Sequence, residues 1–139
     1  MGANRDAWLR MAGRMTNLAW IGVAGALGAL ARYGLALAVQ RGVGTAFPWG
    51  ILTVNTAGCF LFGAVYGLAE ERGVIRPDMR AIALIGFLGA FTTFSTFAFD
   101  TLSLIRAERY ALAAGNVVLS NALGVAAAFA GLALSRATA

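Results

Sequence analysis

Four long apolar runs, separated by short polar breaks, take up most of this chain. A helix needs about 20 mostly apolar residues to cross a bilayer, where every backbone polar group must be satisfied within the protein. The four runs have that length, and they extend over residues 18–39, 47–69, 82–105 and 111–134. The sequence therefore predicts an all-α membrane protein with four transmembrane helices, forming a single membrane domain over residues 1–139.

The composition favours the same setting and argues against catalysis. Hydrophobic residues make up 60% of the chain and charged residues 12%, whereas soluble domains average about 25% charged. There is no histidine, no pair of carboxylates placed as a catalytic site, and one thiol, Cys59, without a neighbouring base. Because these are the groups that most enzymes use for proton transfer and nucleophilic attack, we expect no enzyme.

The distribution of the arginines indicates how the chain is oriented in the membrane. A net charge of +5 would suggest nucleic acid in a soluble protein, but here most arginines flank the apolar runs, so we expect no nucleic-acid partner. The short loops put seven arginines on one side of the membrane: Arg5, Arg10, Arg14, Arg72, Arg76, Arg80 and Arg136. Three lie on the other side: Arg41, Arg106 and Arg109. This modest bias favours both termini in the cytoplasm.

Several polar side chains lie inside the apolar runs, where they cost free energy unless a partner or a wet cavity satisfies them. They are Arg32, Asn55, the hydroxyl residues from Thr92 to Thr96, Asp100, Asn116, Ser120 and Asn121. Asn55 lies near the middle of the second run, and its amide has two donors and an acceptor to satisfy. Arg32 either reaches the interface or lies at the mouth of a vestibule. Asn116, Ser120 and Gly124 form one stripe that lines a path or packs against another helix.

The third run contains the most unusual segment, "GFLGAFTTFSTFAFD", residues 86–100. Glycines followed by consecutive threonines form a weak helix, since threonine is β-branched and competes for backbone hydrogen bonds. We therefore predict a break near the middle of this helix, whose freed carbonyls suit a cation such as sodium. Beyond it, Phe94 and Phe97 share a helix face. Phenyl rings usually pack, but their positive edges can also meet a small anion, and the interleaved hydroxyls favour that role.

Three motifs in this order resemble the bacterial fluoride channels called Fluc, or CrcB proteins. They are "GALGALARY" at 25–33, "GILTVNTAGCFLFG" at 50–63 and "GFLGAFTTFSTF" at 86–97. The resemblance extends over all four runs. It implies a dual-topology homodimer of two antiparallel copies, with two narrow fluoride pathways and one central, structural sodium ion. It further implies a multi-pass protein of the bacterial inner membrane that exports fluoride passively and so lowers cytoplasmic fluoride.

The resemblance also assigns roles to residues. The main-chain carbonyls of Gly89 and Thr92 would bind the sodium ion, and Arg32 would belong to the charged vestibule. The fluoride pathway would be lined by two rings, an amide donor and two hydroxyls: Phe94, Phe97, Asn55, Ser120 and Thr96. The chain departs from common family patterns at Ile51, where threonine is frequent, and at Asn116 and Gly124, where some members carry tyrosine and a second serine.

Two other functions remain open on the sequence. Proton-coupled exporters of the small multidrug type are also four-span, dual-topology dimers, but they need a carboxylate in the first span. The first apolar run of this chain contains Arg32 and no acid. A scaffold subunit without transport activity would need only the glycine-rich helices, and it leaves Asn55 and the alternating rings and hydroxyls unexplained.

Overall fold

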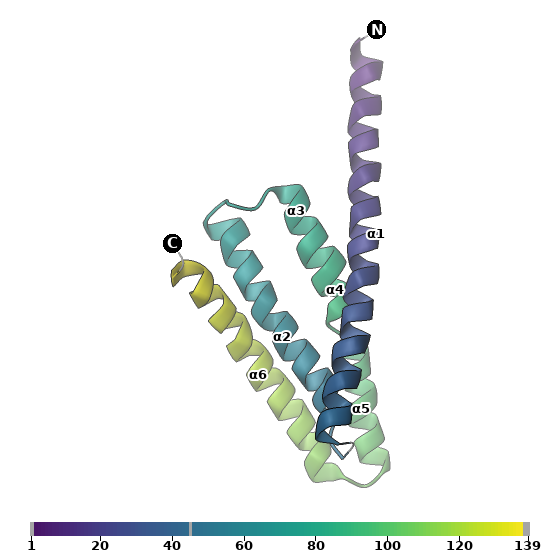
Figure 1. Ribbon diagram of the computed structural model, residues 1–139, viewed down its shortest axis with the longest axis vertical. Helices are drawn as coiled ribbons and strands as arrows, with labels where there is room; N and C mark the ends of the chain where they lie inside the picture. Colours follow the sequence, from purple (N-terminus) through teal and green to yellow (C-terminus); the bar gives the residue numbers. More distant parts are fainter. Residues whose placement is uncertain (1, 45, 138–139) are drawn as a thin grey trace.

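The computed structural model describes residues 2–44 and 46–137, with side chains from residue 13 onward, and this part of the chain is helical without strands (Figure 1). Two of its segments, η1 and η2, are π-helical, with one extra residue per turn. In chain order the elements are α1 (Gly2–Val43), α2 (Trp49–Tyr66), η1 (Gly67–Glu71), α3 (Pro77–Ala81), η2 (Ile82–Leu88), α4 (Gly89–Phe91), α5 (Phe94–Arg106) and α6 (Tyr110–Ala137).

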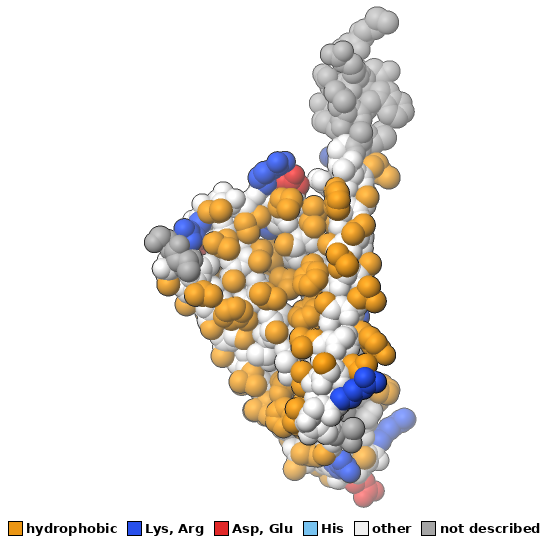
Figure 2. Space-filling view, viewed as in Figure 1, with side chains coloured by type: hydrophobic (Ala, Val, Ile, Leu, Met, Phe, Trp, Pro, Cys, Tyr) orange, Lys and Arg blue, Asp and Glu red, His pale blue; other side chains and the backbone are white. Residues whose placement is uncertain are grey.

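These elements combine into four helical stretches that are long and apolar enough to cross a membrane, which confirms the predicted number. They are Gly13–Val43, Trp49–Glu71, Pro77–Arg106 and Tyr110–Ala137. Figure 2 shows apolar side chains over the middle of the molecule, with most of the visible arginines and acids near its two ends. This distribution is that of a multi-pass membrane protein.

Helices α2 and α6 lie side by side (Figure 1) and touch backbone to backbone. A Cβ atom on Gly63 would collide with the carbonyl oxygen of Ala128, and one on Gly131 would collide with the carbonyl oxygen of Phe60. Small residues permit this approach, and dispersion contacts between the backbones hold helices together where lipid removes the hydrophobic driving force. The two helices therefore form a closely packed pair.

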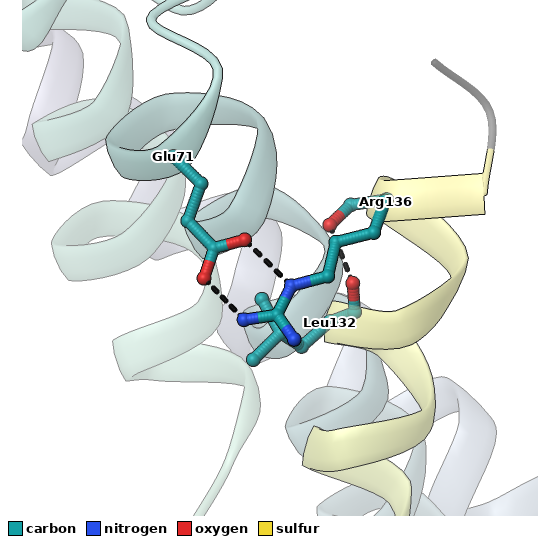
Figure 3. A network of polar contacts seen from close by, with 4 residues as sticks. Glu71, Leu132 and Arg136 are labelled. Carbon is teal, nitrogen blue, oxygen red and sulfur yellow. Dashed lines mark hydrogen bonds and ion pairs between the residues drawn. The ribbon is translucent and has the colours of Figure 1, made fainter.

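An ion pair between Glu71 and Arg136 lies at one end of helices α2 and α6 (Figure 3). Arg136 Nε donates to Glu71 Oε2 at 2.8 Å, and its Nη2 donates to Oε1 at 2.6 Å. The contact fastens η1 to the last turn of α6. Since the Arg136 side chain is 61% exposed and that of Glu71 is 34% exposed, the ion pair contributes modestly to stability and is weakened by salt.

The third span is interrupted, as predicted, although the break lies slightly later than Gly89. Thr92 (φ −82°, ψ 156°) and Thr93 (φ −152°, ψ 119°) are extended, whereas Gly89 is still helical as the first residue of α4. The two β-branched threonines, rather than the glycine, are the non-helical residues, which agrees with their preference for extended backbone. The π-helical stretch η2 ahead of the break was not predicted.

The break lies next to a cluster of buried apolar residues. Val54 of α2, Leu88 of η2 and Phe91 of α4 pack together, and each is at most 5% exposed. This cluster presses the end of α4 against the middle of α2. It thereby brings Asn55, the residue after Val54, to the interruption.

Candidate functional site

A groove of about 320 Å³ opens on the surface of the protein beside the break. Residues from α2, the third span and α6 line it, and none of the lining residues carries a charge. Six of the eight predicted site residues contribute to its walls: Asn55, Gly89, Thr92, Phe94, Phe97 and Ser120. The other two, Arg32 and Thr96, lie outside the lining but are hydrogen-bonded to the break.

Asn55 holds the break from the neighbouring helix. Its Nδ2 donates to the carbonyl oxygen of Thr93 at 3.0 Å, and its Oδ1 accepts from the Thr93 N–H at 2.8 Å. Thr93 is buried, with 7% of its surface exposed, so these backbone groups have little access to water and need partners. The amide that was predicted to donate to an anion therefore uses one of its two hydrogens, and its oxygen, to hold the extended backbone.

The two hydrogen bonds between Asn55 and Thr93, which together form a clamp on Thr93, also leave the Gly89 carbonyl without its helical partner. In an uninterrupted helix the Thr93 N–H would donate to the Gly89 carbonyl, four residues earlier. It donates to Asn55 instead, so the Gly89 oxygen loses its helical donor at an exposed position. The Thr92 carbonyl accepts a long hydrogen bond of 3.4 Å from Arg32 Nη1. Two side chains, from α1 and α2, thus hold two successive peptide groups of the break.

Backbone oxygens are the groups here that fit a cation. Among the described residues, no three His, Cys, Asp or Glu side chains come together as a metal site. Carbonyls released from helical bonding are suitable ligands for sodium, and the Gly89 carbonyl meets that description. The Thr92 carbonyl also fits, because a carbonyl has two lone pairs and Arg32 uses one of them.

Thr93 also starts the helix that follows. Its Oγ1 accepts from the Thr96 N–H at 3.2 Å, and it lies 3.1 Å from the hydroxyl oxygens of both Ser95 and Thr96. A threonine in this position satisfies one of the free N–H groups of the first turn. Thr96 therefore lies in a hydroxyl cluster at the start of α5, and its side chain is not part of the groove wall.

The two predicted rings lie next to each other on α5. The ring centroids of Phe94 and Phe97 are 5.4 Å apart, and the ring planes are tilted by 48°. Both rings line the groove, and Phe94 is 80% exposed in the single chain. The edge of a phenyl ring carries the positive part of its quadrupole, so rings at this position can interact with an anion through their edges.

The fourth span supplies the opposite wall. Ser120 lines the groove, whereas Asn116, one turn earlier, is buried with 2% of its surface exposed. The stripe that was predicted either to line a path or to pack therefore does both, at different residues. Its third member, Gly124, is buried facing α2, where an added Cβ would lie 3.5 Å from the Cys59 sulfur.

The role of Thr93 was not predicted from the sequence. Thr93 is held by Asn55 and caps α5, yet it was treated as one of several similar hydroxyls. The signal that could have found it is its position: the second of two consecutive threonines, three residues before Thr96, matches the spacing of a helix N-cap. Cys59 and Asn121 also line the groove; Asn121 was noted as a polar residue inside an apolar run, but neither residue was assigned to the site.

The sequence is similar to those of known proteins. The profile of the family described as CrcB-like protein, Camphor Resistance (CrcB), matches residues 19–132. The chain is 50% identical over 119 residues to a protein of Nitrosococcus oceani named fluoride-specific ion channel FluC, a match that covers 86% of this chain and 95% of the relative. It is 48% identical over 122 residues to a protein of the same name from Solidesulfovibrio magneticus, covering 88% and 98%.

Proposed function

The chain belongs to the CrcB family, and we propose that it is a fluoride-selective channel of the bacterial inner membrane through which fluoride leaves the cell passively. The observation that carries this proposal is the uncharged groove that gathers Asn55, Phe94, Phe97 and Ser120 beside the broken helix. A proton-coupled exporter would need a titratable group in its path, and no acid lines this groove. Such a path favours passive conduction, which lowers cytoplasmic fluoride when the ion is concentrated inside the cell.

The groove offers an anion several weak donors in place of its hydration shell. The edges of the Phe94 and Phe97 rings supply positive potential without a full charge, so they attract an anion and still release it. Asn55 retains one amide hydrogen beyond the one given to Thr93. The α5 helix begins at Phe94, and the positive end of its dipole points into the same region.

The groove is open, and this supports a dimer. A ring that is 80% exposed cannot enclose an ion within one subunit, so a second copy would have to cover Phe94 and complete the pathway. We propose that two antiparallel copies do so, forming two pathways. Both insertion orientations are then required, and the sequence bias of seven arginines against three would be too weak to prevent this.

We further propose that one sodium ion lies where the two broken helices meet. The freed Gly89 carbonyl and the Thr92 carbonyl of each subunit would hold it, and it would balance the partial negative charge at the ends of α4. Its role would be structural. We expect the dimer purified in sodium to melt at a higher temperature than the dimer exchanged into potassium, a larger ion. Equal melting temperatures in the two salts would argue against the sodium site and leave the fluoride pathway untouched.

Reconstituted liposomes test the main proposal. We expect vesicles that contain the purified protein, loaded with fluoride and chloride, to release fluoride down its gradient and to retain chloride. The reason is that the remaining hydrogen of the Asn55 amide forms a stronger hydrogen bond with fluoride, the smaller halide, than with chloride, which is a larger and weaker acceptor. Ion-selective electrodes measure both releases in one sample. Equal release of the two halides, or release of neither, would contradict the proposed function and would favour the scaffold alternative.

A further inference from the structure

A chain of hydrogen bonds joins the two walls of the groove through the protein interior. Ser120 Oγ donates to Asn116 Oδ1 at 3.4 Å, and Asn116 Nδ2 donates to Thr101 Oγ1 at 2.9 Å. Thr101 Oγ1 in turn donates to the Phe97 carbonyl at 2.9 Å. The chain therefore starts at a groove residue of α6 and ends at the backbone of a groove residue of α5.

The central hydrogen bond of this chain, between Asn116 and Thr101, involves a buried amide. Asn116 is 2% exposed, and a buried amide that loses its partner leaves polar groups that neither lipid nor apolar side chains can satisfy. The Thr101 hydroxyl can accept this hydrogen bond from Asn116, because it donates its own hydrogen to the Phe97 carbonyl and its oxygen still has a lone pair available. Each hydrogen bond in the chain has one defined donor and one defined acceptor, and together the bonds orient the side chains of Thr101, Asn116 and Ser120.

The spacing along the helices places this bond one turn from the groove. Thr101 follows Phe97 by four residues on α5, and Asn116 precedes Ser120 by four residues on α6, so in each pair the side chains share a helix face. The bond between Asn116 and Thr101 thus ties α5 to α6 next to the position where Phe97 and Ser120 face the groove. By contrast, α6 meets α2 through backbone contacts at glycines.

We propose that the bond between Asn116 and Thr101 sets the separation of the groove walls and thereby helps determine which anion passes. This inference rests on the proposed fluoride channel and adds two positioning residues to it. With the bond in place, the Phe97 ring and the Ser120 hydroxyl stay close enough for a small anion alone. Without it, α5 moves away from α6 and the groove admits a larger halide. The oxygen of Asn116 also orients the Ser120 hydroxyl.

Two substitutions at Thr101 separate bonding from shape. Thr101→Val keeps the volume and removes the hydroxyl, whereas Thr101→Ser keeps the hydroxyl. We expect the ratio of fluoride to chloride release from liposomes to fall about tenfold in Thr101→Val, which is roughly the discrimination that one hydrogen bond sustains. We expect Thr101→Ser to retain the ratio of the unmodified protein.

A double substitution protects the test against misfolding. Asn116→Leu combined with Thr101→Val replaces both partners of the bond by apolar groups, which is often close to neutral for stability. We expect it to lose selectivity at least to the extent of Thr101→Val alone, because it removes the same bond and also the acceptor of the Ser120 hydroxyl. If both valine variants release fluoride with undiminished selectivity over chloride, the inference is wrong although the channel proposal stands. If the unmodified protein releases no fluoride, the channel proposal itself fails.

Discussion

Substitution of Asn55 by leucine is expected to abolish fluoride release, because it removes both hydrogen bonds that hold Thr93 in its extended conformation. Each bond contributes about 1 kcal/mol, and a buried donor left unpaired costs a further 1–3 kcal/mol. The total of roughly 3–5 kcal/mol shifts the equilibrium between the intact and the disrupted break by at least about 100-fold toward the disrupted form. Fluoride release from liposomes measures the effect, and detergent gel filtration shows whether the protein still assembles.

Thr56, the next residue along the helix, supplies a matched control. Its Oγ1 is buried and has no hydrogen-bond partner within the described part of the chain, so Thr56→Val removes a hydroxyl that holds nothing. We expect this variant to release fluoride at the unmodified rate. Comparable losses in both variants would mean that α2 tolerates no change at this depth. Full activity of Asn55→Leu would show that the clamp on Thr93 is dispensable.

Substitution of Phe94 by isoleucine is expected to stop fluoride flux without preventing dimer formation. The ring is 80% exposed in the subunit and therefore contributes little to the core of its own chain. Isoleucine keeps an apolar side chain but has no ring edge, so the positive potential offered to an anion at this point disappears. Liposome release and the elution volume of the purified protein measure flux and assembly separately.

Phe99 serves as the control for that experiment. It lies on the same helix and is 66% exposed, but it does not line the groove. We expect Phe99→Ile to conduct normally. If Phe94→Ile conducts as well as Phe99→Ile, the ring at position 94 is not part of the pathway, whatever its exposure.

The number of spans and the presence of the break could be predicted because both depend on local sequence. Apolar length determines the spans, and the tandem threonines weaken one helix at a definite place. The sequence also pointed to Asn55, since an amide at membrane depth must have a partner. For the same reason it drew attention to Arg32 and Ser120 before any contact was known.

The partners could not be predicted, because they depend on how distant segments pack. Asn55 and Thr93 are 38 residues apart, and Arg32 and Thr92 are 60 apart. No helical periodicity indicates that a side chain will bond to the backbone of another span. Asn116 is buried whereas Ser120 lies at the groove. This difference between two residues of α6 likewise depends on the angle at which α5 and α2 approach α6.

The clamp at Thr93 has a consequence for the order in which this protein is made. A third span that enters the bilayer before it meets α2 has no Asn55 amide to receive its Thr93 N–H, and lipid offers no substitute. The nearest acceptor is then its own Gly89 carbonyl, so the newly inserted span is expected to wind as a continuous helix. The interruption would arise only when the helices dock. A chain whose helices have not yet docked would then leave the membrane sealed to ions.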